Sequence, residues 1–348
     1  MKHSLILIFS GFLAVGTAAH WVKNAWAEEE CSPAAGWNYV CGPVGAEDLV
    51  RVPQTPWIVG SGMAENQNPG KLHLINTDKK DWDTLYPTVG ARHELDAKTY
   101  RACPGPPDAG KFGAHGIAIR DDGNLMSTLL AVNHGREAIE VFRINAADKR
   151  PSIDWIGCVP MDETIYVNSV AFLPDGGFVF TKFFDPKAPE GFGSIMQGKP
   201  TGGVYEWHPD TGVQSIGGTD LAGANGIEVS KDGKSIYVAA WGTQELVRFS
   251  RQNGSVKKDT VKVDFNPDNL RWAPDGMILI AGQTRNPDAP GGFGFKGWKV
   301  VKLNPETMEL IEVARDPGES PLQNASVAID IDGTLWIGSF QADRIAYR

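Results

Sequence analysis

The stretch Asn225-Gly-Ile-Glu-Val-Ser-Lys-Asp-Gly-Lys-Ser-Ile-Tyr-Val238 decides the fold. Two alternating apolar runs flank an Asp-Gly pair, which predicts a β-hairpin because both turn positions favour positive φ. The pattern recurs in four further copies, which begin at His115, Asn168, Asn269 and Ala325. The five turn aspartates are 53, 57, 43 and 57 residues apart. Such a period predicts that each copy is one unit of a repeat architecture.

Each hairpin is followed by further strand-like runs. After the Asp232-Gly233 turn, a third strand is predicted at Ile236–Ala240 and a fourth at Glu245–Phe249. A degenerate copy around Trp57-Ile-Val-Gly60 brings the number of units to six. Four strands per repeat are typical of β-propeller blades, which bury their apolar faces against one another. The prediction is an all-β protein whose residues 28–348 form one domain, a six-bladed propeller with four-stranded blades around a central channel.

The composition agrees with a turn-rich β protein. Gly 40 and Pro 23 together make about 18% of the 348 residues, whereas roughly 12% is usual. Hydrophobic residues at 42% and charged residues at 22% exclude a disordered chain and a polytopic membrane protein. The formal net charge of −9 disfavours nucleic acid as a partner, because an acidic surface repels phosphates.

Residues 1–27 have the features of a secretory signal peptide. Lys2 and His3 form a short basic start, Leu5 to Val15 is an apolar run, and Ala25-Trp26-Ala27 fits a cleavage site. The run is shorter than the ~20 residues of a comfortable transmembrane helix, so no stable membrane span is expected after cleavage. An uncleaved anchor is the alternative. The prediction is an exported protein, either periplasmic or secreted.

Four cysteines are present, and export favours disulfides because they persist in oxidising compartments. Their even number is compatible with two disulfides, but four cysteines allow three pairings that the sequence does not distinguish. Free, buried structural thiols are the alternative. No Cys-x-x-Cys pair or His/Cys cluster indicates a zinc site. The cysteines are Cys31, Cys41, Cys103 and Cys158.

Polar residues recur at the slot where each innermost propeller strand begins, and equivalent slots face the same axis. Asp268 precedes one of them, and Glu47-Asp48 lies just before the first blade. Amide and carboxylate oxygens suit a hard cation such as calcium, whereas a softer metal prefers His and Cys. Each asparagine alone is explained as a turn cap, but four equivalent positions together favour a metal. The four are His115, Asn168, Asn225 and Asn269.

Two histidines are candidates for acid–base chemistry. His134 ends the run Leu129-Leu-Ala-Val-Asn-His134, and an antiparallel hairpin returns that end toward His115. A neutral imidazole beside an ion-bound carbonyl can take a proton from water. A structural pair of hydrogen-bonded histidines is the alternative. Phe183, Phe184, Trp241 and the Phe293–Phe295 loop are expected to line an apolar substrate pocket.

These motifs resemble those of the paraoxonases, over most of residues 45–347. His115-Gly-Ile, Leu-Leu-Ala-Val-Asn-His134 and Pro267-Asp-Asn269 carry the resemblance, and Asn225-Gly-Ile is shared with the wider gluconolactonase and strictosidine synthase-like propellers. The resemblance implies a six-bladed propeller that uses calcium to hydrolyse lactones and aryl esters, so that the partner is a small-molecule ester or lactone.

By motif match, the resemblance also implies roles for individual residues. His115 would be the general base and His134 its partner. A second, structural calcium would use Asp48 and the Ile117 carbonyl. Its expected third ligand, an aspartate, is Ser169 in this chain, which puts that site in doubt. The catalytic calcium would be held by Glu47, Asn168, Asn225, Asp268 and Asn269.

The chain departs from the family at two further places. Thr181-Lys-Phe-Phe-Asp185 replaces a more polar segment, so Lys182 is expected in the site as an added cation. The family's C-terminal cysteine is missing, so closure of the propeller is expected to rest on strand pairing. Two other functions stay open: a sugar-lactone hydrolase of the gluconolactonase type, which would not need His134, and a non-enzymatic exported propeller that binds a ligand or partner.

Overall fold

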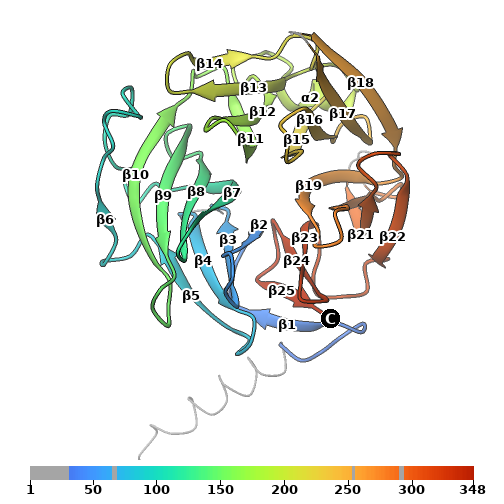
Figure 1. Ribbon diagram of the computed structural model, residues 1–348. Coiled ribbons are helices and arrows are strands. Elements are labelled where there is room, and N and C mark those ends of the chain that lie inside the picture. The colour runs from blue at the N-terminus through green and yellow to red at the C-terminus, as the bar shows by residue number, and fades with distance from the viewer. Residues whose placement is uncertain (1–30, 65–68, 253–254, 290–293) are drawn as a thin grey trace, which may run out of the picture.

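The computed structural model describes residues 31–64, 69–252, 255–289 and 294–348. Six small sheets stand around a central axis (Figure 1), which confirms the predicted six-bladed propeller. From the strand nearest the axis, the next strands of the sequence follow outward by antiparallel pairing, except at the outer edge of two of the six sheets. The predicted signal peptide, residues 1–27, lies outside the described residues.

Each blade is built from four main strands, ordered from the axis outward. Blade 1 contains β2 (Ala46–Arg51), β3 (Trp57–Gly62), β4 (Lys71–Asn76) and β5 (Asp81–Tyr86). Blade 2 contains β7 (Ala114–Gly123), β8 (Met126–Asn133), β9 (Ala138–Asn145) and β10 (Ser152–Pro160). Blade 3 contains β11 (Tyr166–Phe172), β12 (Phe178–Phe184), β13 (Gly203–His208) and β14 (Gly212–Ser215). Blade 4 contains β15 (Ala224–Val229), β16 (Ser235–Ala240), β17 (Glu245–Gln252) and β18 (Ser255–Lys262). Blade 5 contains β19 (Asn266–Trp272), β20 (Ile278–Arg285), β21 (Phe295–Leu303) and β22 (Leu310–Asp316). Blade 6 contains β23 (Ala325–Ile331), β24 (Thr334–Ser339), β25 (Arg344–Tyr347) and β1 (Asn38–Cys41).

Two blades depart from a plain run of four consecutive strands. In blade 2 a two-residue strand, β6 (Arg92–His93), adds to the outer edge of β10 in parallel, so this sheet has five strands. In blade 6 the outermost strand is β1, which pairs antiparallel with β25 from Asn38↔Tyr347 to Cys41↔Arg344. The first and last strands of the described residues therefore pair with each other and close the propeller, as predicted.

The five Asp-Gly pairs all lie in or beside hairpin turns, but the predicted turn geometry holds at one of them. Asp332 and Gly333 form a two-residue turn with φ of 53° and 85°. In blade 2 the turn lies two residues later, at Asn124-Leu125. In blades 3 to 5 five-residue loops connect the strands, and only the glycine has positive φ. A turn of that length needs a left-handed residue at one position rather than two.

The hydrophobic core lies between neighbouring blades rather than within one sheet. Among the described residues, six apolar clusters each combine side chains of two adjacent blades. Val59 of blade 1 and Phe142 of blade 2 belong to one of them, and Leu49 of blade 1 and Trp336 of blade 6 belong to another. All four are buried. Each blade is thus stabilised by both neighbours, as a repeat architecture requires.

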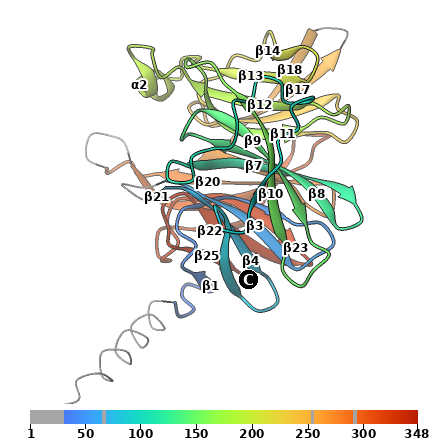
Figure 2. The same ribbon diagram turned by 90° about the vertical axis from the view of Figure 1, so that its left-hand side faces the viewer.

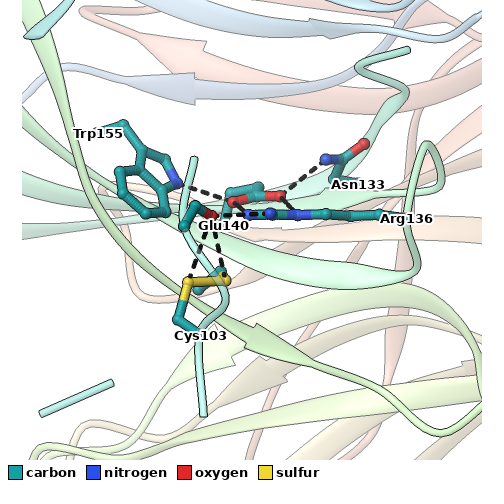
Figure 3. Close-up of a disulfide and its surroundings, with 7 residues drawn as sticks. Cys103, Asn133, Arg136, Glu140 and Trp155 are labelled. Atoms are coloured by element: carbon teal, nitrogen blue, oxygen red, sulfur yellow. Dashed lines mark hydrogen bonds and ion pairs between the residues drawn. A yellow bond between two sulfur atoms is a disulfide. The ribbon is translucent and has the colours of Figure 1, made fainter. Parts of the chain in front are cut away.

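All four cysteines form disulfides, Cys31–Cys41 and Cys103–Cys158. The first bond ties the segment before β1 to the end of that strand. The second ties the loop before β7 to β10 (Figure 3). Two disulfides are consistent with the predicted export. Within the described ranges, no helix combines the length and apolar character needed to cross a bilayer.

Candidate active site

Every innermost strand has a shift in pairing register near its beginning. The shifts lie between Ala46 and Asp48, Ala114 and Ile117, Val167 and Val170, Ala224 and Ile227, Pro267 and Leu270, and Ala325 and Val327. A bulge leaves residues unpaired and re-aims their side chains. Six of the predicted site residues lie inside these shifts, namely Glu47, His115, Asn168, Asn225, Asp268 and Asn269. The bulges therefore explain why polar side chains face the axis there.

Glycine follows the polar residue in two of these bulges because the neighbouring strand passes very close. A Cβ on Gly116 would lie 2.4 Å from the Asn168 carbonyl oxygen, and one on Gly226 would lie 2.3 Å from the Asp268 carbonyl oxygen. Neither distance is compatible with a side chain. The His-Gly-Ile and Asn-Gly-Ile motifs thus bring adjacent innermost strands into backbone contact at the level of the site.

Glu47, Asn168, Asn225, Asp268 and Asn269, which we call the oxygen cluster, are all buried. Asn269 Nδ2 donates to Glu47 Oε1 at 2.5 Å, which joins β19 to β2. Asp268 Oδ2 accepts a hydrogen bond from Gln283 Nε2 at 2.8 Å. Asn168 begins blade 3, between the strands that carry His115 and Asn225.

Four oxygens of this cluster are buried without any hydrogen-bond donor. They are Glu47 Oε2, Asn168 Oδ1, Asn225 Oδ1 and Asn269 Oδ1. An unpartnered buried acceptor costs free energy, so several of them at one end of the channel indicate a missing positive partner. Three of these four oxygens belong to asparagine amides rather than to carboxylates. Among the described residues, no three or more His, Cys, Asp or Glu side chains are grouped so that they could hold a metal ion. The donor set fits a hard cation that accepts neutral amide ligands.

The pKa values of the two carboxylates in the oxygen cluster also indicate a missing positive partner. Burial, followed by the charges of Asp48 and Asp268, raises the pKa of Glu47 well above its ordinary value. Burial also raises the pKa of Asp268 to about 7, with Asp48 adding to the effect. Two buried acids beside one another are costly to ionise without a cation. A bound divalent ion would remove that cost.

The two predicted histidines are in direct contact. His115 Nδ1 and His134 Nε2 are 2.7 Å apart, and His115 Nε2 lies 3.7 Å from Glu47 Oε1. His115 is buried, and burial followed by the charge of His134 lowers its pKa well below the ordinary value. A buried, neutral imidazole therefore stands between the oxygen cluster and His134.

Two residues that the sequence did not single out complete this pair. Glu137 Oε2 lies 3.0 Å from His134 Nδ1, and Glu137 Oε1 accepts from the Val167 amide at 2.9 Å. Tyr166 stacks on His134, with ring centroids 4.1 Å apart and planes 13° from parallel. The sequence did contain a local indication of Glu137, because this residue follows His134 by three positions in one tight turn. Nothing local links Tyr166 to His134.

A buried carboxylate, Glu140, binds residues of the turn that carries His134 and Glu137. Figure 3 shows it with Asn133, Arg136 and Trp155. Arg136 donates to both Glu140 oxygens, at 2.7 and 2.6 Å. Asn133 donates to Oε1 and Trp155 to Oε2, each at 2.8 Å. Asn133 Oδ1 in turn accepts from the amides of Gly113 and Gly135. Residues on both sides of His134 are thus fixed by one network.

An aromatic wall extends from His134 toward the helix α2 (Gly191–Met196), which projects from one face of the propeller (Figure 2). Tyr166 contacts Phe184 at 4.9 Å between centroids, and Phe184 contacts Phe183 at 6.0 Å. Beyond them, Trp241 contacts Phe183 and Phe295. The wall therefore includes the predicted aromatic residues except Phe293, which lies outside the described residues.

Lys182 does not lie where it was expected. Its Nζ is 4.0 Å from Asp185 Oδ2, and its side chain lines a cavity with Gly203, Ser215 and Thr219. Ser215 belongs to β14, the outermost strand of blade 3. Lys182 follows Thr181 on β12, the second strand of blade 3, and the Thr181 hydroxyl donates to the Asn225 carbonyl. Because successive side chains of a strand point to opposite faces of the sheet, the Lys182 side chain points away from the face that Thr181 occupies.

The residues expected at a second calcium site are close together, but an arginine lies between them. Arg271 Nη2 donates to Asp48 Oδ2 and to the Ile117 carbonyl oxygen. Asp48 Oδ2 also accepts from the Ile117 amide at 2.9 Å. Ser169 is buried, and its hydroxyl has no hydrogen-bond partner. The sequence did not indicate this position of Arg271.

Comparison with known proteins agrees with the resemblance found in the motifs. A family model described as "SMP-30/Gluconolactonase/LRE-like region" matches residues 91–284, more than half of the chain. Serum paraoxonase/arylesterase 1 of Mus musculus is 25% identical over 343 residues, which cover 91% of this chain and 89% of that protein.

Solved structures support the fold. A luciferin-regenerating enzyme superposes with a TM-score of 0.56 at 14% identity and covers 88% of this chain and 91% of its own. Regucalcin from Agrobacterium tumefaciens, described as a calcium-binding protein, superposes with a TM-score of 0.53 at 12% identity, over 89% of this chain and 92% of its own. At such identities the likeness concerns the propeller alone.

Proposed function

The chain belongs to the SMP-30/gluconolactonase/LRE-like family, and on that premise we propose that it is a calcium-dependent hydrolase of lactones and aryl esters. One observation carries the proposal. Four unpartnered oxygens of the oxygen cluster lie at the end of the channel where His115 contacts Glu47, and His115 is paired with His134. An oxygen-rich cation site beside a buried neutral base is what metal-assisted hydrolysis of an ester requires.

Calcium fits the donor set better than a softer metal does, because the cluster offers amide and carboxylate oxygens only. Glu47, Asn168, Asn225, Asp268 and Asn269 would hold the ion. When bound, calcium supplies Lewis-acid polarisation of a carbonyl and stabilises negative charge that develops on its oxygen. Gln283, which donates to Asp268 Oδ2, orients that carboxylate from outside the cluster.

The hydrogen bonds among the histidines determine which nitrogen acts as the base. A carboxylate only accepts, so Glu137 fixes the proton of His134 on Nδ1. His134 Nε2 is then an acceptor and takes a hydrogen bond from His115 Nδ1–H. The lone pair of His115 is left on Nε2, the nitrogen that lies near Glu47. His115 Nε2 therefore takes the proton of an attacking water, while His134 and Glu137 stabilise the imidazolium that forms.

The aromatic wall favours substrates with an apolar part. Tyr166 and Phe184 continue directly from His134, so an acyl chain or aryl ring bound there stays close to the base. A sugar lactone, which is covered with hydroxyl groups, finds few polar partners along this wall. The preferred substrates are accordingly aryl esters and alkyl lactones.

The decisive experiment is a substrate panel with purified mature protein. An aryl acetate, an alkyl δ-lactone and an aldonolactone are each assayed with calcium and with a chelator. We expect hydrolysis of the first two, loss of activity in chelator and recovery when calcium is restored. The variant H115Q should lower kcat by about 10²–10⁴-fold without changing calcium affinity.

Other outcomes separate the alternatives. Preference for the aldonolactone, with activity unaffected by replacement of His134, would identify a gluconolactonase-type enzyme. Calcium binding without hydrolysis of any substrate would identify a non-enzymatic binding propeller. Activity and melting temperature that are both indifferent to chelator would refute the calcium site itself.

We also propose that the protein is exported with residues 1–27 removed, and that residues 28–348 form a single domain. The two disulfides support export because such bonds persist in oxidising compartments. Amino-terminal sequencing of the protein recovered outside the cytoplasm tests the cleavage site. A protein that retains residues 1–27 in the membrane fraction would instead be anchored.

A further inference from the structure

We propose that the guanidinium of Arg271 is a built-in cation that replaces a second metal ion in the channel, so that the channel binds at most one divalent ion. This inference does not rest on the proposed hydrolase activity. It starts from an arginine that is 6% exposed and lies on the innermost strand of blade 5. A buried charge of this kind is stable only when it is paired and fully hydrogen-bonded.

Every N–H of the guanidinium has an acceptor. Nε donates to the Leu49 carbonyl at 3.0 Å, and Nη2 donates to Asp48 Oδ2 and to the Ile117 carbonyl. Nη1 donates to the Leu270 carbonyl at 2.6 Å and to Glu228 Oε1 at 3.4 Å. An arginine has five such donors, so none is left over.

The acceptors come from strands that are far apart in the sequence. Asp48 and Leu49 lie on β2, Ile117 on β7 and Glu228 on β15, while Arg271 and Leu270 lie on β19. One side chain therefore joins four of the six blades at the axis. A metal ion coordinated between blades performs the same function.

The acceptors are also of the type that a hard cation would use. They comprise three carbonyl oxygens and two carboxylates, which are ordinary calcium ligands. Asp48 is fully buried and has its second oxygen bonded to the Leu49 amide. With Arg271 in place, a second ion would meet a positive charge, and all five of these acceptors are already hydrogen-bonded to it. Without Arg271, the same oxygens would form a vacant site for an ion.

An ion has a route to that site. Arg271 and Glu228 line a cavity of about 290 Å³, together with Arg51, Phe172, Trp272 and Asp330. These residues stand near the ends of the innermost strands, whereas the oxygen cluster stands at their beginnings. The cavity therefore enters the channel from the end opposite to the oxygen cluster.

The test counts ions and measures thermal stability, neither of which requires a substrate. Wild-type protein and R271A are dialysed against calcium, and bound calcium is measured by elemental analysis. We expect R271A to bind one ion more per chain than wild type. Its melting temperature in chelator should fall by on the order of 10 °C, because breaking a buried charge pair is strongly destabilising, and calcium should restore most of that loss.

Arg51 provides a matched control, because it lines the same cavity and pairs with exposed Asp332. R51A removes an arginine from this end of the channel and should gain no ion. Two bound ions in the wild-type channel would overturn the proposal. So would an R271A protein that gains no ion. If R271A does not fold even in excess calcium, R271Q is measured in the same way, and failure of both variants to fold would also refute it.

Discussion

At the scale of the residue, Glu137 decides how the histidine pair is protonated. Its carboxylate lies 3.0 Å from His134 Nδ1, and its other oxygen is held by the Val167 amide. We expect E137Q to lower kcat by about 10–100-fold with little change in KM, because an amide at this position no longer fixes the His134 tautomer or stabilises an imidazolium. The amide oxygen of the variant still accepts from Val167, so the turn should fold normally.

The measurement combines steady-state kinetics with ¹⁵N NMR of the imidazoles, which reports the tautomer of each histidine directly. E137D restores a carboxylate and should recover part of the lost activity. E94Q alters a carboxylate that pairs with exposed arginines on blade 2 and serves as the control. An E137Q protein with wild-type kcat and unchanged histidine spectra would show that Glu137 has only a structural role.

A second residue-scale prediction concerns pH. Burial lowers the pKa of His73 from 6.5 to about 4, with Lys71 adding to the effect while the Val44 carbonyl opposes it. The unfolded chain therefore binds this proton more readily than the folded protein. Stability is intact above pH 6.5 and falls by on the order of 3 kcal/mol as the pH drops from 6.5 to 4.

Denaturant unfolding at several pH values measures that slope. H73Q keeps a donor for the Val44 carbonyl, which lies 3.0 Å from His73 Nε2, but has no proton to gain. The variant should lose the corresponding part of the acid slope. H93Q, which removes an exposed histidine on β6, controls for the loss of any histidine. An unchanged slope in H73Q would exclude His73 as its origin.

At the scale of the element, the bulge at the start of each innermost strand is the feature on which the site depends. In blade 4 the bulge requires Gly226, since a Cβ there would lie 2.3 Å from the Asp268 carbonyl oxygen. We expect G226A to destabilise the protein by about 1–3 kcal/mol and to weaken calcium binding, because the strand that carries Asp268 and Asn269 has to move.

Thermal unfolding and calcium titration of the same variant test both effects. Gly217 offers a control, because nothing lies within 4 Å of a Cβ built there. G217A should change stability by no more than about 0.5 kcal/mol. If G226A loses stability but binds calcium as tightly as wild type, the bulge does not position the cluster.

The elements also show how far the sequence alone was informative. The blades and the slot of His115, Asn168 and Asn225 were predictable, because a repeat places equivalent residues at equivalent points. The turn geometry was predicted wrongly in four of five copies. In three of them Asp-Gly lies in a longer loop in which only the glycine has positive φ, and in blade 2 the two-residue turn forms at Asn124-Leu125 instead. Glu137 was within reach of local reasoning. Arg271 was not, because its acceptors lie on strands up to 223 residues away.

At the scale of the whole molecule, closure depends on non-covalent pairing between the two ends of the chain. β1 pairs with β25 along four residues, and β25 pairs with β24. Neither disulfide spans this junction. Cys31–Cys41 lies wholly on the amino-terminal side, with a sequence separation of 10, and Cys103–Cys158 lies at blade 2. Side chains reinforce the pairing, since Trp37 packs on Trp298 and beneath Arg348.

This arrangement predicts unequal effects for two changes near the junction. The double variant C31S/C41S removes a short cross-link and should cost about 3 kcal/mol, with one cooperative unfolding transition retained. Deletion of residues 344–348 removes β25, so that β1 loses its only strand partner among the described residues. The deletion also removes Tyr347, which stacks on Trp336 in the core between blades 6 and 1. That deletion should abolish cooperative unfolding. Calorimetry of both proteins measures the unfolding temperature and the cooperativity of each transition. A deletion variant that unfolds cooperatively near the wild-type temperature would mean that the interfaces between the other blades hold the propeller closed without β25.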